Sequence, residues 1–219
     1  TEVVRGSETM EAGWTLNFIQ ETLTGEQIFF CLPVLCAFPY ASSFIDEYQS
    51  GMVKFSLTRT KKRKLWLISK ASVTALSGGG VLAAGVLAVT IVSCMIFMPL
   101  ETAAVQTETA ADISWTPWLE LLMRCFCFGA VGSVTGLWLS SAVNNRYMAW
   151  IGPFMAMYLL VILYERYFSQ YPVIYPREWL ALTMGWPWNG WSACVFMLLL
   201  TLLAAWAFYQ SADRRLKNV

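Results

Sequence analysis

The feature that most constrains this chain is a stretch of thirty residues, 71–100, that contains no charged side chain. A bilayer core of about 30 Å requires about 20 apolar residues in helical form, so this stretch is long enough to cross a membrane. Inside lipid, an isolated apolar segment must satisfy its backbone N–H and C=O groups within itself, which only a helix does. The sequence therefore predicts an all-α bundle of membrane-spanning helices. Five spans are predicted, at about 27–45, 66–98, 117–143, 147–164 and 191–212.

The composition agrees with a membrane protein and argues against several other classes. Charged residues make up 13% of the chain, whereas soluble domains carry about 25%. The chain has no histidine, which removes the commonest metal ligand and the side chain best suited to proton transfer near neutral pH. It also lacks the GxxxxGK[ST] loop that binds nucleotide phosphates. We expect no catalytic site, no metal or cofactor in this chain, and no nucleic-acid partner.

The charges between the spans predict how the chain lies in the membrane. Loop 46–70 and the tail are rich in Lys and Arg, whereas segments 1–26 and 101–116 are mainly acidic. Positively charged loops stay in the cytoplasm, so the N-terminus is expected outside and the C-terminus inside the cell membrane. A further span upstream of Thr1 would explain an outside N-terminus and would bring the total to six. The predicted parts are an extracellular segment at 1–26, a transmembrane domain at 27–212 and a cytoplasmic tail at 213–219.

The first cytoplasmic connection contains a short segment, 48–59, that has two interpretations. Met52, Phe55 and Ser56 recur at the i, i+3, i+4 spacing of one helix face, and Gly51 allows the chain to bend as it leaves the membrane. One interpretation of this pattern is a docking helix for a soluble protein. A basic anchor beside anionic lipid is the other interpretation, because each Lys or Arg near such a surface contributes about 1 kcal/mol.

Two features near the outer ends of the spans also have two interpretations each. Segment 168–190 is rich in Pro and aromatic residues, which predicts either short broken helices dipping into the outer leaflet or an aromatic belt with ordinary turns. Glu120 and Arg124 have the i, i+4 spacing of a favourable local ion pair. A charge within a span also suggests a functional site, so a structural pair and a functional pair both remain open.

Residues of the first cytoplasmic connection resemble the permease subunits of the type-2 ABC transporter family. Those proteins have an acidic residue at the inner end of the second span, then a glycine, an apolar docking helix, a basic residue and a lysine at the start of the third span. The matching residues here are Glu47, Gly51, Met52, Leu57, Arg59 and Lys70. The order of spans and loops is also similar. Thr58 stands where the family often has a proline.

The resemblance implies a mechanism and a set of partners. Two permease subunits would pair around a central path, and each docking helix would lie in a groove of a separate ATPase subunit that binds the ATP and Mg²⁺. The residues expected to couple this chain to the ATPase are Glu47, Gly51, Met52, Phe55, Leu57 and Arg59. The substrate class expected is amphipathic or hydrophobic, with a peptide, including an antimicrobial peptide or toxin, ahead of a lipid or drug.

Other functions compete with an exporter permease. A non-catalytic membrane scaffold or accessory subunit would use small-residue helix faces for assembly, such as the GxxxG of Gly132 and Gly136. An ion- or proton-coupled carrier is disfavoured, because the middle of the spans lacks acidic residues and histidine. A membrane enzyme is disfavoured further, because no loop gathers catalytic groups.

Overall fold

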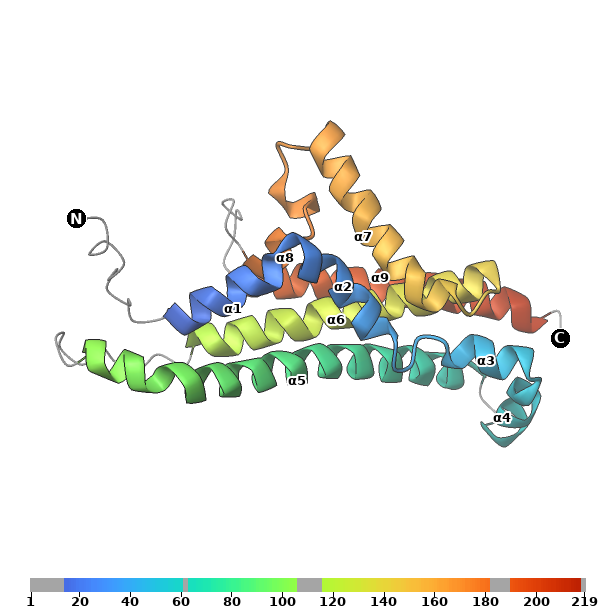
Figure 1. Ribbon diagram of the computed structural model, residues 1–219. Helices are drawn as coiled ribbons and strands as arrows, with labels where there is room; N and C mark the ends of the chain where they lie inside the picture. The colour runs from blue at the N-terminus through green and yellow to red at the C-terminus, as the bar shows by residue number, and fades with distance from the viewer. Residues whose placement is uncertain (1–13, 61–62, 106–115, 182–189, 218–219) are drawn as a thin grey trace.

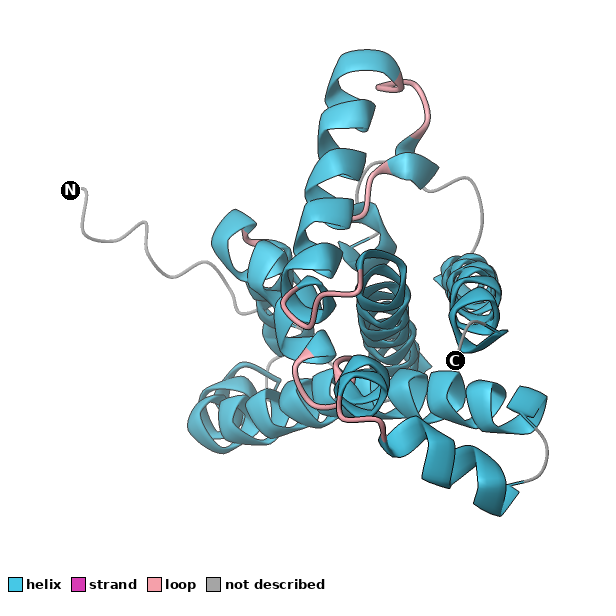
Figure 2. Ribbon diagram, turned by 90° about the vertical axis from the view of Figure 1, so that its right-hand side faces the viewer, coloured by secondary structure: helices cyan, strands magenta, loops and turns pink. Residues whose placement is uncertain are grey.

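The computed structural model describes residues 14–60, 63–105, 116–181 and 190–217, and within these ranges every regular element is a helix. Figure 2 shows helices and connecting loops only. The all-α prediction is thus confirmed for the described residues. The elements, in chain order, are α1 (Trp14–Thr24), α2 (Glu26–Ala37), α3 (Ser43–Gln49), α4 (Met52–Thr60), α5 (Arg63–Val105), α6 (Thr116–Val143), α7 (Met148–Tyr167), the 3-10 helix η1 (Pro172–Ile174), α8 (Glu178–Ala181) and α9 (Gly190–Lys217).

Four of these helices, α5, α6, α7 and α9, are long and apolar enough to cross a membrane, and they indicate a membrane protein. They cover the predicted spans 66–98, 117–143, 147–164 and 191–212. In Figure 1 the long helices α5, α6 and α9 run side by side, whereas α7 leans away from them. After α7, η1 and α8 bring the chain back to the bundle.

The predicted first span at 27–45 is not one helix. Its apolar part forms α2, which ends at Ala37, and the chain then turns before α3 begins at Ser43. Pro39 lies in this turn, where its ring removes a backbone N–H that a continuing helix would use, although Phe38 before it still has helical backbone angles. Twelve residues rise only about 18 Å, too little to cross the hydrocarbon layer alone. The structure therefore does not support a fifth continuous span over these residues.

Part of the predicted extracellular segment 1–26 also folds into a helix. Residues 14–24 form α1, and Gly25 separates α1 from α2. Helix α1 contacts α5 and α8 as well as α2, so it belongs to the helical bundle. Residues 1–13 lie outside the described part of the chain.

Helix α6 is the centre of the bundle, and its glycines explain how its neighbours come so close. A Cβ atom on Gly129 would lie 2.5 Å from the Gly78 carbonyl oxygen of α5, and one on Gly136 would lie 2.3 Å from the Ala149 carbonyl oxygen of α7. Both distances are shorter than van der Waals contact, so only glycine fits at these two positions. The GxxxG that the sequence offered as a face for assembly packs against helices of this same chain. Gly132, the other half of the GxxxG, faces Pro33 of α2.

Helix α5 is unusually long. Its 43 residues correspond to about 65 Å at 1.5 Å per residue, roughly twice the thickness of a bilayer core. It contacts α6 through Gly78 and Gly79, and a Cβ on Gly79 would lie 2.7 Å from the Phe126 carbonyl oxygen. Gly80, in contrast, has open space around it. Of the three consecutive glycines, Gly78 and Gly79 are therefore needed for the close contact with α6, and Gly80 is not.

The buried apolar side chains form two large clusters, one toward each end of the bundle. We call the end that carries α3 and α4 the α4 end, and the opposite end, which carries α1 and α8, the α8 end (Figure 1). The cluster near the α4 end includes Phe44, Val53, Trp66, Leu137 and Phe208. The other cluster includes Trp179 of α8 and residues of α2, α6 and α9.

Candidate functional site

A sharp corner joins α3 to α4 at the α4 end of the bundle. Gly51 stands at the corner with φ of +75°, in the left-handed region that side chains with a Cβ adopt only at a cost. Its N–H donates to the Tyr48 carbonyl over 3.2 Å, and the Lys54 N–H donates to the Gly51 carbonyl over 3.3 Å. The bend expected at Gly51 is therefore present, and it is the backbone conformation that requires the glycine.

The short helix α4 has one buried apolar side chain and two exposed ones. Val53 is buried and packs in the cluster that contains Phe44 and Trp66. Met52 and Phe55, one helical turn apart, are 61% and 78% exposed. Among the described side chains of α4, Val53 is thus packed against the bundle, and Met52 and Phe55 form an apolar edge with high surface exposure. The backbones of Leu57 and Arg59 lie in α4, but their side chains lie outside the described part of the structure.

A buried lysine fixes α3 to α5 directly behind this corner. Lys70 is only 8% exposed, and its ammonium group forms an ion pair with the Glu47 carboxylate. It also donates to the Tyr40 hydroxyl over 3.2 Å and lies 5.1 Å from the centre of the Tyr40 ring and 5.8 Å from that of Trp66. A buried cation is costly unless it is paired and hydrogen-bonded. These contacts meet that requirement and give the acidic residue before Gly51 a definite structural partner.

Further charged contacts connect the other helices at the same end. The Arg63 guanidinium at the start of α5 lies 3.1 Å from the Asp213 carboxylate of α9 and also donates to the Asp213 carbonyl. Arg146, in the turn between α6 and α7, lies 3.5 Å from Asp46 of α3. Through these contacts α3, α5, α9 and the α6–α7 turn are joined to one another around α4.

The α6–α7 turn has its own backbone signal. Asn144 adopts φ of 60° directly after α6, the left-handed conformation in which helices commonly end and which Asn tolerates better than most residues. The Gln49 side-chain amide lies 3.5 Å from the Asn144 carbonyl, and Arg215 donates to the Ala142 carbonyl over 2.7 Å. The turn is thus in contact with α3, and the last residues of α6 are in contact with α9.

The α8 end holds a buried cation of a different kind. Arg124 of α6 is 4% exposed, and its guanidinium donates to the Leu180 carbonyl of α8 over 2.9 Å. Its Nε atom is buried and finds no acceptor within the described residues. The i, i+4 spacing predicted Glu120 as the partner of Arg124. Among the described residues, however, the Glu120 carboxylate forms no ion pair with the Arg124 guanidinium. The sequence-distant carbonyl of α8, not the neighbouring acid, is the hydrogen-bond acceptor of this arginine.

Trp179 of α8 closes the same end with an aromatic ring. It is 2% exposed, and its ring centre lies 6.4 Å from that of Phe128 and 5.6 Å from that of Phe196. Its indole N–H donates to the Val173 carbonyl over 2.8 Å. The short helices η1 and α8 agree with the broken-helix interpretation of segment 168–190. The remainder of that segment, 182–189, lies outside the described residues.

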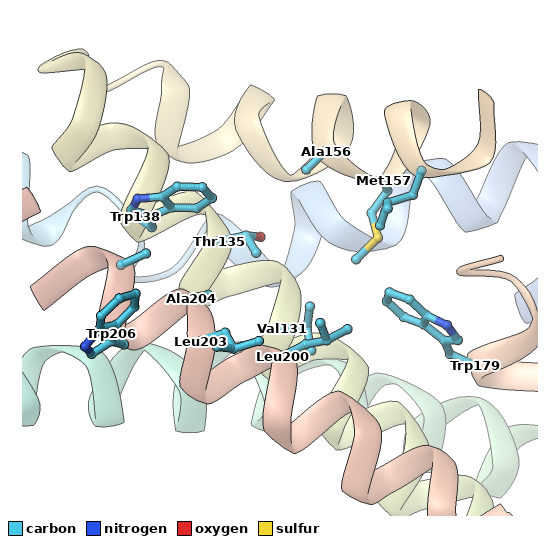
Figure 3. Close-up of a pocket in the computed structure, with 12 residues that line it drawn as sticks. Val131, Thr135, Trp138, Ala156, Met157, Trp179, Leu200, Leu203, Ala204 and Trp206 are labelled. Carbon is cyan, nitrogen blue, oxygen red and sulfur yellow. The ribbon is translucent and has the colours of Figure 1, made fainter. Parts of the chain in front are cut away.

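An apolar pocket of about 360 Å³ lies between α7 and α9, with α6 as its floor and Trp179 at one end (Figure 3). We call it the lateral groove. Its lining side chains are aliphatic, aromatic or sulfur-containing, apart from one threonine. They are Val131, Thr135, Trp138, Ala156, Met157, Leu160, Trp179, Leu200, Leu203, Ala204, Trp206 and Ala207.

The structure thus places the predicted site residues in two separate groups. Glu47, Gly51, Met52 and Phe55 lie together at the α4 end, and Glu120 and Arg124 lie on α6 toward the α8 end. Sequence reasoning missed the contacts of Asp46, Arg63 and Asp213 and the closing role of Trp179. The excess of charged residues in the predicted cytoplasmic loops indicated that one end of the bundle would be polar. It did not indicate which charged residues would form ion pairs there.

Comparison with known proteins gives one match. A family model described as "Protein of unknown function (DUF2705)" matches residues 6–175, which include α1 to α7 and η1. No curated protein and no solved structure matches the chain significantly.

Proposed function

The chain belongs to the DUF2705 family, and from that premise we propose that it is the membrane-spanning permease subunit of an ATP-driven exporter of the type-2 ABC class. The observation that supports this proposal best is the corner at Gly51. There a short helix is fixed by Val53 and presents Met52 and Phe55 away from the bundle. We propose that this edge lies in an apolar groove of a separate ATPase subunit, which binds the ATP and Mg²⁺.

The charges of the α4 end support a cytoplasmic position for this edge. Positively charged residues mark the cytoplasmic side of membrane proteins, and this end of the bundle carries most of the described Lys and Arg residues. They are Lys54, Arg63, Lys64, Lys70, Arg146, Arg214, Arg215 and Lys217. In this orientation α4 faces soluble proteins, and the C-terminus is cytoplasmic at the cell membrane.

The contacts behind α4 support a path for force between the ATPase and the spans. Helix α3 is joined to α5 through Glu47 and Lys70 and to the α6–α7 turn through Asp46 and Arg146. A displacement of α4 by a moving ATPase would therefore be passed to α5 and to the beginning of α7. A second copy or a related permease would complete the transport path, and an amphipathic substrate, a peptide first, would move through it.

Two substitutions on the exposed edge test the coupling. Burying a phenylalanine contributes about 1.5–3 kcal/mol, and a carboxylate cannot replace it, so Phe55→Asp should weaken ATPase binding roughly ten- to a hundredfold. Met52→Asp should act in the same direction. The measurement is vanadate-sensitive ATP hydrolysis in the complex purified through a tag on the full chain from its own membranes.

A matched control separates coupling from general damage. Tyr147 lies at the same end and is 61% exposed, as Met52 is, but it belongs to the α6–α7 turn. Tyr147→Asp should leave the associated ATPase activity unchanged, because the Tyr147 side chain lies outside α4 and takes no part in the two ion pairs that join α3 to α5 and to this turn. Full ATPase activity in Phe55→Asp would contradict the coupling role, and a wild-type complex without vanadate-sensitive hydrolysis would favour a membrane scaffold.

A further inference from the structure

The lateral groove plays no part in the proposed coupling, yet its shape and chemistry define a ligand. We propose that the lateral groove binds the hydrocarbon chain of a membrane amphiphile that enters sideways from the bilayer. As a substrate site this inference rests on the proposed function, because only a transporter would move the bound molecule, and the substrate in this groove would be a lipid and not the peptide ranked first above. As a lipid-binding site it stands independently of that function.

The side chains at one edge of the groove are exposed, and those deeper in it are buried, as expected of a site that opens to the side. Leu203 and Trp206 of α9 stand at its rim and are 60% and 61% exposed. Met157 of α7 and Ala204 of α9 lie deeper and are buried. Because α6, α7 and α9 are helices of membrane-spanning length, the rim faces hydrocarbon, and the most abundant molecule at this rim is lipid.

The polarity of the lining excludes an extended peptide. Thr135 supplies the only hydroxyl among the lining residues, and it already donates to the Gly132 carbonyl over 2.8 Å. The indole N–H of Trp179 is likewise used by the Val173 carbonyl. An extended peptide brings an N–H and a C=O for every residue, and each unsatisfied group costs several kcal/mol in a nonaqueous site.

A helical peptide satisfies its own backbone groups, so width and not polarity distinguishes it from a lipid chain. A helix with its side chains is about 10 Å wide. The groove holds about 360 Å³, and Met157 and Ala204 in its lining are buried, so its deeper part is narrow. A flexible hydrocarbon chain needs neither hydrogen-bond partners nor the width of a helix, and it is the ligand that suits this lining.

The two ends of the groove give the ligand a direction. Trp179 closes the α8 end, whereas Trp138 and Trp206 stand at the opposite end with their indole nitrogens on the side away from Trp179 (Figure 3). Tryptophan places its N–H toward polar groups at a membrane interface. The polar part of the amphiphile therefore lies toward the α4 end and the tip of its chain points to Trp179.

Photolabelling tests this assignment directly. The full chain is placed in phosphatidylcholine vesicles that contain a small fraction of a phosphatidylcholine with a photoreactive diazirine near the tip of one chain. After irradiation, adducts are located by mass spectrometry. Label at Met157 should exceed label at Leu199 at least threefold, although Leu199 is 55% exposed and Met157 is buried, because Leu199 does not line the groove.

A pair of neighbouring substitutions provides the control. Leu203→Trp fills the rim and should lower the label at Met157 at least threefold, whereas Leu202→Trp should not, since Leu202 is 65% exposed but outside the groove. Label that follows surface exposure alone would overturn the proposal. So would competition for Met157 by an added helical peptide but not by added fatty acid, or a crosslink from a second copy at this position.

The experiment needs neither ATP nor an ATPase, so its outcome is separate from that of the coupling test. Phe55→Asp, which should weaken ATPase binding, should leave the label at Met157 unchanged. Loss of the label with intact coupling would remove the lipid site alone, and loss of coupling with intact label would remove the permease assignment alone.

Discussion

Apart from the buried Lys70, the charged side chains at the α4 end of this bundle are held differently from Arg124 at the α8 end. At the α4 end, ion pairs such as Asp46–Arg146 and Arg63–Asp213 are partly open to solvent, so water can replace a broken contact. At the α8 end, Arg124 is buried and donates to a carbonyl, and Trp179 seals the surroundings. Contacts of the first kind can be remade at little cost, whereas those of the second cannot. The difference indicates that the contacts of Asp46 and Arg63 can be exchanged more readily than those of Arg124 and Trp179.

The largest effect should come from removing the aromatic seal of the α8 end. Trp179→Ala deletes a buried ring and a hydrogen bond to Val173, which should cost about 3–5 kcal/mol of stability. For a chain of this size the melting temperature in detergent should fall by roughly 10 °C, at about 2–4 °C per kcal/mol. Trp191→Ala is the control, since Trp191 is 52% exposed. Equal shifts for the two variants would contradict the proposed difference in packing.

A smaller effect is expected where charge is partly buried at the α4 end. Glu47→Ala leaves the Lys70 ammonium without its carboxylate, and because the Glu47 side chain is 30% exposed, we expect a loss of about 1–3 kcal/mol. Combining it with Lys70→Met should recover part of that loss in a double-mutant cycle followed by thermal melting. Strict additivity of the two changes would show that the ion pair does not contribute.

The corner itself should show a purely conformational cost. Gly51→Ala adds a Cβ that meets no atom within 4 Å, but the left-handed backbone should cost about 1 kcal/mol. Gly80 offers the opposite case, because it is helical with open space around it, and Gly80→Ala should stabilise by roughly 0.5–1 kcal/mol. Melting temperatures that move in the same direction for both variants would refute this explanation.

The smallest effect should be at the most exposed ion pair. Arg146 and Asp46 are 3.5 Å apart, with half-exposed side chains, so Arg146→Gln should change stability by no more than about 0.5 kcal/mol. The change should disappear in about 1 M salt, where charges are screened within roughly 3 Å. A large fall in melting temperature that does not depend on salt would contradict this prediction. It would show that the pair contributes to stability as the buried contacts of the α8 end do.

The long helices could be predicted from sequence because their signal is local. Residues 71–100 have no charge, and no soluble fold accounts for such a stretch. The same reasoning failed at 27–45, where hydrophobicity continues through the turn at Pro39 and hides the end of α2. It also passed over α1, although Leu16, Ile19 and Leu23 follow helical spacing. The glutamates of that segment favoured an extracellular assignment and obscured the helical spacing.

The site was less predictable because its contacts join residues far apart in the chain. Gly51 could be identified, since a positive φ favours glycine and the residue stands between two short amphipathic segments. The partner of Arg124 could not, because the Leu180 carbonyl lies 56 positions away and a backbone oxygen has no sequence signature. The local rule pointed to Glu120 instead. The lateral groove draws its lining from four helices, and the sequence of no single helix reveals it.

The length of α5 has a mechanical consequence. The close contact of Gly78 and Gly79 with α6 divides this rod into unequal arms, about 24 Å from Gly79 to Arg63 and about 39 Å from Gly79 to Val105. A tilt of roughly 10° about that fulcrum moves the tip of the longer arm by roughly 7 Å, while the shorter arm moves by roughly 4 Å. A tilt driven at Arg63 would therefore be amplified at the opposite surface, and the distance from each tip of α5 to a fluorescent label on α6 would measure the lever ratio.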